Sequence, residues 1–526
     1  MNNTEKFIPI IGKNAIENLT RGMYDVAFFV YREYVQNAAD QIDIAKKQGL
    51  YQSENEPSIF ITIEPENKKI IIEDNATGIK QTEVFPLLGN IAQSTKNKYE
   101  DKGFRGIGRL GGLGYCEKLT FETSFFGENV KSTMVWDAKK LLQLIDDDKV
   151  TIGAAELISI ITNFSFDNNE KADTHYFKVI MENVTREDLL DVAEVRNYLS
   201  MVAPVPFANT FTFKDKIYTR AKEDGIKIDE YNIFINTDQL FKGYQDIIRN
   251  EVGAKKDEIV DISFFEEEYN QKPLFWGWYG ITTEMQQIPN KNNENFARGI
   301  RLRKSNIQIG LETRLDDFHK DPAEGNLYFM GEVYARNKKL IPNGRRDFFI
   351  DNEECTQFSR NLKEIFKKLY TIYYDFSKKN AAIKDSQNLE KNKEIIKDTT
   401  LDEQKKKKIT AEIERLEKRV TDAKTSIPRI LNKYKDTNTE IFNVLNDSIK
   451  ESGFDFTPKQ ENLTPTKTVQ NKQQTSTTQT ATVITNQIIS LQEKNVLERV
   501  FSILRKNLIN STAEELIKKI EEEFKR

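Results

Sequence analysis

Hydrophobic and polar residues alternate in patterns that predict helices and strands in mixed order. Residues 23 to 48 repeat apolar side chains at helical spacing and end at Gly49, which indicates a helix. The runs between 58 and 74 are short, apolar and alternating, as in two paired strands. Further strand patterns follow between residues 118 and 182. This order predicts an α+β domain with an antiparallel sheet.

The pattern changes twice further along the chain. The turn-like A-P-V-P-F at 203 to 207 indicates a domain boundary, and mixed strands and helices then continue to about residue 375. The next stretch is helical, with a coiled-coil seam that ends at Pro428. The seam could pair with a second chain or fold back on residues 359 to 398. The seam residues are Ile409, Ile413, Leu416, Val420, Ala423 and Ile427.

The last part of the chain is rich in threonine and glutamine before helical periodicity resumes. The threonine- and glutamine-rich stretch contains too few large apolar side chains to form a core, which predicts a flexible linker. The helical segment after it carries apolar residues that need a partner. The predicted divisions are 1–205, a middle α/β domain at 206–375, a coiled-coil region at 376–455, the linker at 456–486 and a C-terminal helical segment at 487–526.

Composition narrows the class of protein. The net charge of -4 gives no global attraction to nucleic acid or membrane. Two cysteines and two histidines among 526 residues exclude a cysteine-histidine zinc cluster and a disulfide framework, and they indicate a reducing compartment. We see neither an apolar run of membrane-spanning length nor a cleavable signal, so a cytoplasmic protein is expected.

Candidate chemistry is concentrated between residues 32 and 114, in three polar clusters. In the first, Glu33, Asn37 and Asp40 are spaced so that a helix places two carboxylates and a carboxamide on one face. Apolar residues surround this face, which indicates that it does not point into bulk water. The cluster therefore predicts one side of a binding pocket.

The second and third clusters supply an acid and a flexible backbone. Asp74 ends a strand-like run and is followed by a turn that contains Gly78, which places a carboxylate at a pocket edge. Gly103, Gly106 and Gly108 belong to a glycine-rich run whose backbone N–H groups can approach a phosphate. No G-x-x-x-x-G-K-[ST] motif occurs, so a P-loop is excluded. The dinucleotide fingerprint formed by the same glycines fails because no buried strand leads into it.

In this order and spacing, the clusters resemble the nucleotide site of the superfamily joining gyrase, heat-shock-protein-90 chaperones, histidine kinases and MutL, abbreviated GHKL. E-x-x-x-N-x-x-D and G-F-R-G-I-G match its motifs, whereas Ala76 replaces the first glycine of D-x-G-x-G. The resemblance covers roughly the first third of the chain. It implies a Bergerat-type α/β sandwich that binds ATP. Heat-shock-protein-90-like ATPases are the closest group, with MutL and MORC proteins as the second choice.

The resemblance also implies roles for these residues. Asp74 would accept a hydrogen bond from the adenine amino group, and Asn37 would offer its side-chain oxygen to Mg²⁺. Glu33 would activate the attacking water, and the three glycines would wrap the phosphates. Asp40 would either contact the nucleotide through water or cap the local network.

Two further groups follow from the resemblance. Ser94, Thr95 and Lys96 match the hydroxyl and lysine positions of a lid over bound ATP, although a solvated loop has the same composition. Thr174 begins a late strand, where the family uses a threonine beside adenine; an ordinary strand threonine is the alternative.

A cation from the middle domain completes the expected site. The segment L-I-P-N-G-R-R-D resembles the one from which heat-shock-protein-90 chaperones send an arginine to the γ-phosphate. Alignment on its asparagine and aspartate assigns that role to Arg346, with Arg345 an alternative and Lys338 or Lys339 less favoured. A surface salt-bridge pair is the structural alternative. Such an arginine would make hydrolysis depend on domain docking.

The sequence therefore predicts a Mg²⁺-dependent ATPase of the heat-shock-protein-90-like type. We expect a homodimeric conformational switch or chaperone-like clamp that acts on a protein partner, in bacterial stress or defence. One alternative is a MutL- or MORC-like DNA clamp whose channel is lined by basic groups at 298–304 or 405–408. The other is a nucleotide-sensing interaction module that barely hydrolyses ATP, although Glu33 argues against it.

Overall fold

The computed structural model divides the chain into two compact units, Met1–Pro458 and Lys459–Arg526. Within the part of the chain that is described, no helix is both long and apolar enough to cross a membrane. The predicted linker and most of the C-terminal segment lie outside the described residues. The structure describes residues 10–22, 26–51, 56–93, 99, 102–103, 106–290, 294–321, 325–398, 400–456, 501 and 516–520.

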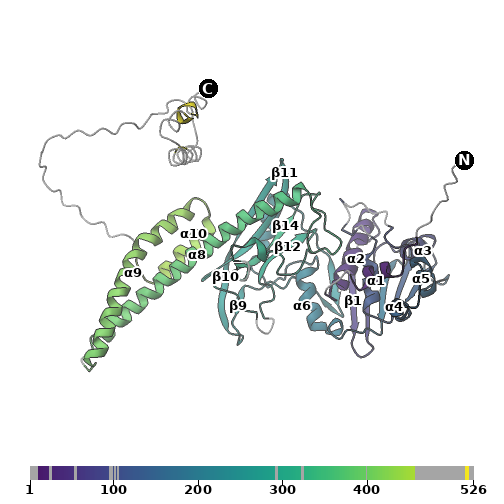
Figure 1. Cartoon of the computed structure of the whole chain (residues 1–526), viewed down its shortest axis with the longest axis horizontal. Coiled ribbons are helices and arrows are strands. Elements are labelled where there is room, and N and C mark those ends of the chain that lie inside the picture. The colour runs from purple at the N-terminus through teal and green to yellow at the C-terminus, as the bar shows by residue number, and fades with distance from the viewer. Residues whose placement is uncertain are drawn as a thin grey trace. The chain divides into compact units, whose positions relative to one another are not determined.

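The first sheet has eight strands in the order β5-β4-β3-β6-β2-β1-β7-β8 (Figure 1). Every neighbouring pair is antiparallel except β1 and β7, which are parallel. The sheet and its helices confirm the predicted α+β class. The strands are β1 (Ser58–Glu64), β2 (Lys69–Asp74), β3 (Lys118–Ser124), β4 (Lys131–Asp137), β5 (Thr162–Asp167), β6 (Tyr176–Glu182), β7 (Asn232–Ile235) and β8 (Asp238–Gln239).

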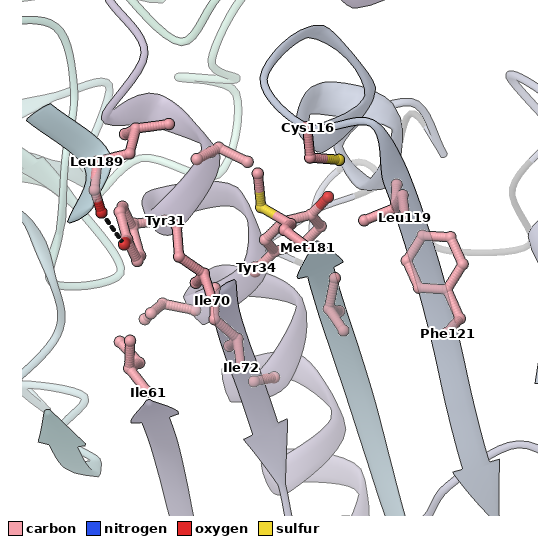
Figure 2. Close-up of a cluster of buried hydrophobic side chains, with 14 of the residues drawn as sticks. Tyr31, Tyr34, Ile61, Ile70, Ile72, Cys116, Leu119, Phe121, Met181 and Leu189 are labelled. Atoms are coloured by element: carbon pink, nitrogen blue, oxygen red, sulfur yellow. Dashed lines mark hydrogen bonds between the residues drawn. The ribbon is translucent and has the colours of Figure 1, made fainter. Parts of the chain in front are cut away.

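Helix α2 (Phe29–Lys47) packs its apolar face on this sheet. Figure 2 shows Tyr31 and Tyr34 of α2 over Ile61, Ile72 and other strand residues. The Tyr31 hydroxyl donates to the Leu189 carbonyl oxygen at 2.6 Å, which satisfies the polar end of a buried ring. The packing of this apolar face leaves the opposite, polar face of α2 to the candidate site. The other helices of this region are α1 (Asn14–Thr20), α3 (Gln81–Gly89), η1 (Gly108–Gly114), α4 (Ala138–Asp146), α5 (Ala154–Ile161), η2 (Asp188–Leu190) and α6 (Val192–Val202).

The first sheet extends past residue 205, where the sequence pattern placed the end of the first domain. After α6, the chain forms α7 (Lys214–Glu223), which packs into the core of the second sheet, and then returns to add β7 and β8 to the first sheet. The backbone amide of Tyr231 donates to the Pro204 carbonyl oxygen, and the amide of Lys242 donates to that of Pro206. Three passes of the chain thus lie side by side at this junction.

The second sheet has six strands in the order β13-β12-β14-β11-β10-β9. One face buries Trp276 and Trp278 together with Phe211 and Tyr244, and the other packs Phe275 against the helices that follow. The strands are β9 (Ile247–Arg249), β10 (Lys255–Tyr269), β11 (Lys272–Thr282), β12 (Gly299–Lys304), β13 (Ile307–Gln308) and β14 (Met330–Ala335), with the 3-10 turns η4 (Asp316–Phe318) and η5 (Gly325–Tyr328).

Three long helices follow: α8 (Glu353–Ile395), α9 (Glu403–Lys435) and α10 (Thr439–Glu451). The side chains of Asn352, Asp402 and Asn438 cap their N-termini by accepting from backbone amides. Helix α9 runs back along α8 (Figure 1), so the seam folds back within the chain. The predicted end of the seam at Pro428 is wrong, because Ile430 and Tyr434 continue the buried face of α9.

Candidate functional site

A cavity of about 420 Å³ lies where the polar face of α2, the end of β2, the glycine-rich segment before η1 and the loop after β14 meet. This volume is within the range of small-molecule sites. The wall includes Lys102 and Arg346, which are 244 positions apart in the chain. The middle domain therefore contributes directly to a cavity built mostly by the first domain.

Two of the three predicted residues on α2 line this cavity. Glu33 and Asn37 lie one helical turn apart on its wall. Asp40 is not among the lining residues. Its carboxylate accepts hydrogen bonds from the backbone amides of Lys102 and Gly103, each at 3.0 Å. Asp40 therefore connects the glycine-rich segment to α2.

The motif does not include Arg32, yet this side chain is almost fully buried beside Glu33. Its Nη2 donates to Glu33 Oε1 at 2.9 Å and to the Arg345 carbonyl oxygen at 3.3 Å. Its guanidinium carbon lies 4.2 Å from the centre of the Phe29 ring. One guanidinium thus orients the carboxylate of Glu33 and contacts the loop that carries Arg346. The sequence signal was only an adjacent charge pair, which is common on exposed helices.

The second cluster contributes Asp74 and Gly78 to the wall of the cavity. Asp74 is 2% exposed at the end of β2, and one of its oxygens accepts from the Ala76 amide at 3.1 Å. Gly78 has φ +66°, and a Cβ there would lie 1.8 Å from the Ser124 carbonyl oxygen. Ala76 is not among the residues with positive φ, so the missing first glycine of the motif causes no strain.

The glycines of the third cluster allow the backbone to lie on the polar face of α2. A Cβ on Gly103 would be 2.5 Å from Gln36 Nε2, and one on Gly108 would be 2.5 Å from Glu33 Oε2. Gly106 has φ +67°. All three glycines line the cavity. A side chain at these positions would displace the groups that the site presents.

Two cations in this segment were not predicted as site residues, because the glycine run directed attention to the backbone. Lys102 Nζ lies 2.5 Å from Asp43 Oδ2; burial alone would raise the pKa of Asp43, but the contact with Lys102 lowers it. Arg109 donates to the Gly106 carbonyl oxygen at 2.7 Å, and burial lowers its pKa to about 10. Both residues line the cavity, and with a pKa of about 10 Arg109 stays cationic at neutral pH.

Arg346 enters the cavity from the loop after β14. It is 5% exposed, and its Nη1 donates to the Lys102 carbonyl oxygen at 2.6 Å. Arg345, the alternative, is exposed and contacts Arg32 through its backbone. Lys338 is exposed, and Lys339 forms an ion pair of 2.5 Å with Glu354. Among these four cations, Arg346 is the one that lines the cavity.

The remaining predicted residues do not join this group. Thr174 does not line the cavity; its carbonyl oxygen accepts from Ser124 Oγ at 3.1 Å. Thr77 lines the wall instead and donates to Gln41 Oε1 at 3.0 Å. The predicted lid residues Ser94, Thr95 and Lys96 lie outside the described residues.

The residues fit a nucleotide bound with a divalent ion. The wall of the cavity combines an acceptor, Asp74, with apolar side chains such as Ile44 and Phe177 and with glycines and cations. In the described ranges no three His, Cys, Asp or Glu residues cluster as metal ligands. Asn37 on the cavity wall carries a side-chain oxygen, and Mg²⁺ usually binds through one or two protein oxygens, water and substrate phosphates.

Comparison with known proteins agrees with this geometry. Residues 29–169 match the family described as histidine kinase-, DNA gyrase B- and HSP90-like ATPase. The chaperone protein HtpG of Wigglesworthia glossinidia brevipalpis is 22% identical over 72% of this chain and 57% of its own length. HtpG of Enterobacter sp. (strain 638) is 20% identical over 63% of this chain and 49% of its own length. HtpG of Acinetobacter baylyi is 26% identical over 22% of this chain and 21% of its own length. The chain spans about half the length of the first two relatives.

Proposed function

We propose that this chain hydrolyses ATP through a site completed by its middle domain. The premise is that its N-terminal part is an ATPase domain of the histidine-kinase, gyrase and heat-shock-protein-90 type. The observation that carries the proposal is the position of Arg346, which lines the same cavity as Glu33, Asn37 and Asp74. A composite site of this kind makes hydrolysis depend on contact between the two domains.

Glu33 is the proposed general base. Its carboxylate lines the cavity, where it would accept a proton from water as that water attacks the terminal phosphorus. The hydrogen bond from Arg32 fixes one carboxylate oxygen, which leaves the other to contact the water. Arg32 is therefore proposed to orient the base, not to contact ATP.

Arg346, with Lys102 and Arg109 beside it, would stabilise negative charge on the phosphates. Preorganised cations in a partly dry cavity lower the barrier more than the same charges in water. Backbone amides near Gly103, Gly106 and Gly108 would donate to phosphate oxygens. Asn37 would hold Mg²⁺, which neutralises phosphate charge when bound.

Asp74 would select adenine. Its carboxylate is an acceptor on the wall of the cavity and would receive the exocyclic amino group. Guanine has a carbonyl oxygen at that position, so two acceptors would face each other.

For the whole chain, we propose a chaperone-like conformational switch that works as a homodimer on a protein partner. The similarity to chaperone proteins supports the protein partner. The composite cavity supports a switch, because the state of the nucleotide would determine whether Arg346 stays docked.

A steady-state ATPase assay on the full chain tests this function. Glu33→Ala and Arg346→Ala should each lower kcat by about a hundredfold or more, the effect of one positioned catalytic group, with little change in ATP affinity. Glu194→Ala, at an exposed position on α6, is the matched acidic control and should behave as wild type. Wild-type turnover in the Glu33 variant would reject the general-base role.

The same preparation separates the wider hypotheses. ATP-dependent dimerisation, measured as mass by light scattering with ATP and with ADP, would support the switch. ATPase stimulation by double-stranded DNA that disappears at high salt would instead favour a DNA clamp. Tight ATP binding without turnover would indicate a nucleotide sensor.

A further inference from the structure

The hairpin of β12 and β13 lies between the first domain and the loop that carries Arg346. Its strands are joined by Ser305 and Asn306, with φ of +52° and +58°. Positive φ at both turn residues matches the twist of a tight hairpin, and asparagine tolerates this conformation better than most side chains. The hairpin tip therefore has a defined geometry.

The tip is attached to the first domain by two side chains. Arg303 Nη2 donates to the Met201 carbonyl oxygen at 2.6 Å, in the last turn of α6, where a cation is favoured. Asn306 Nδ2 donates to the Asp229 carbonyl oxygen at 2.7 Å, in the segment that leads into β7. Both donors are buried, so each bond replaces water that cannot reach these carbonyl groups.

The other end of the hairpin holds the backbone of Arg346. The Gly310 amide, two residues after β13, donates to the Arg346 carbonyl oxygen at 2.8 Å. A Cβ on Gly310 would lie 2.8 Å from the Asp347 carbonyl oxygen, so the two segments are in close contact. Arg346 itself has φ +56°, a conformation that a non-glycine residue keeps only where neighbouring contacts impose it.

These contacts form a closed cycle that includes two residues of the cavity wall, Lys102 and Arg346. Asp229 Oδ2 lies 3.9 Å from Lys102 Nζ, and the Lys102 carbonyl oxygen accepts from Arg346 Nη1 at 2.6 Å. The cycle then returns through Gly310 and the hairpin to Asn306 and Asp229. A shift of the hairpin tip would therefore act on Arg346 in two ways, through Asp229 and Lys102 on one side and through Gly310 on the other.

Buried charges also fix Arg303 of the hairpin to the second sheet. Arg303 forms an ion pair with Glu332, which also pairs with Lys242 at 2.7 Å. All three side chains are fully buried, and an ion pair in this setting tolerates little displacement. The hairpin therefore moves with the middle sheet.

We propose that Asn306 is a positioning residue for hydrolysis: it fastens the β12–β13 hairpin to the first domain and thereby places the Arg346 guanidinium in the cavity. This inference rests on the proposed ATPase function. Asn306 is not among the residues that line the cavity, so its loss should affect turnover and spare nucleotide binding.

Asn306→Gly is the first test, because glycine keeps the positive φ and removes only the amide side chain. We expect kcat to fall about fivefold, with unchanged KM for ATP, as for coupled residues in one network. Asn270→Gly is the matched control: Asn270 has φ +51° in the exposed turn between β10 and β11. The control should keep wild-type kcat.

A double-mutant cycle with Arg346→Ala gives the decisive readout. If Asn306 acts through Arg346, Asn306→Gly should have no further effect on kcat in the Arg346→Ala background. A full additional loss there, or wild-type kcat in the single variant, would overturn the inference. Should Asn306→Gly fail to fold, Asn306→Asp removes the same donor in nearly the same shape and is subject to the same criteria.

The two proposals fail in different ways. Absence of ATPase activity in the wild-type chain, or an Arg346→Ala variant with normal turnover, rejects the proposed function itself. Loss of turnover in Arg346→Ala together with normal turnover in Asn306→Gly rejects only the positioning role.

Discussion

At the scale of single residues, a substitution that changes one atom or adds one methyl group should be enough to alter the cavity. Asp74 is such a group, because its carboxylate can only accept hydrogen bonds when ionised, whereas an asparagine in its place would also present a donor. The amino group of adenine requires an acceptor.

We predict that Asp74→Asn abolishes ATP binding in isothermal titration calorimetry. Glu73→Gln is the control, since Glu73 is the adjacent residue of β2 and forms an ion pair with Lys178 away from the cavity. Equal affinity in the Asp74 variant and the wild type would remove Asp74 from the adenine contact.

Gly78 supports a second prediction at this scale. Gly78→Ala should lower the free energy of unfolding by about 3 kcal/mol, because the added Cβ would overlap the Ser124 carbonyl oxygen. Gly127 also has positive φ, yet a Cβ at this position would meet no atom within 4 Å, so Gly127→Ala is the control. This control should lose only about 1 kcal/mol, the cost of the backbone conformation. Thermal midpoints of the two variants measure the difference.

Residue patterns pointed to residues that line the cavity only where these residues belong to short motifs. Glu33, Asn37, Asp74 and the glycines share motifs that are short in sequence. Arg32 was missed because its adjacent pairing with Glu33 is common on exposed helices, and Lys102 because folding brings its partner Asp43 near. The position of Arg346 came from a resemblance, since no spacing rule connects it with a helix 300 positions earlier.

At the scale of secondary-structure elements, α8 is held to the second sheet partly by a buried histidine. His319 lies between Phe329 and Phe366, with 4.1 Å between its ring centre and that of Phe366. Burial lowers the pKa of His319 to about 4, against a small opposing effect of Asn326. The folded protein therefore keeps this ring neutral in mild acid.

This lowered pKa predicts acid sensitivity with a definite sign. Between about pH 6.5 and 4, the unfolded chain binds a proton at His319 that the folded chain does not, so stability falls as pH falls. The loss should reach about 3 kcal/mol at the lower end. His319→Phe should flatten the dependence of the thermal midpoint over this window. An unchanged slope would show that His319 is not the group responsible.

Sequence periodicity predicted elements better than it predicted their pairing. Strand β2, which carries Asp74, follows β1 directly in the sequence, and the two strands pair as antiparallel neighbours. Strand β7 has four residues and pairs in parallel with β1, far earlier in the chain. No local pattern distinguishes such a short strand from a loop, and the domain boundary was therefore placed too early to include it.

At the scale of the whole molecule, Glu332 is the buried centre of the middle domain's charge network. Its pKa is lowered to about 2: burial opposes the charge, but Arg303 and Lys242 outweigh that effect. Removal of the carboxylate would leave two buried cations without their counter-charge.

We predict that Glu332→Ala lowers the free energy of unfolding by about 4 kcal/mol. Glu268→Ala, at an exposed position on β10, is the control and should change it by less than about 0.5 kcal/mol. Chemical denaturation followed by tryptophan fluorescence suits this test, because Trp276 and Trp278 lie in the same sheet. Similar curves for both variants would contradict the structural role of the network.

The three side-by-side chain passes near Pro204, Tyr231 and Lys242 limit how the two domains can move. A single linker would let one domain swivel freely about its bonds. Three hydrogen-bonded passes act as a strip that bends across its face but resists torsion. An opening of the cavity is therefore expected to bend this strip and not to rotate one domain about a single bond.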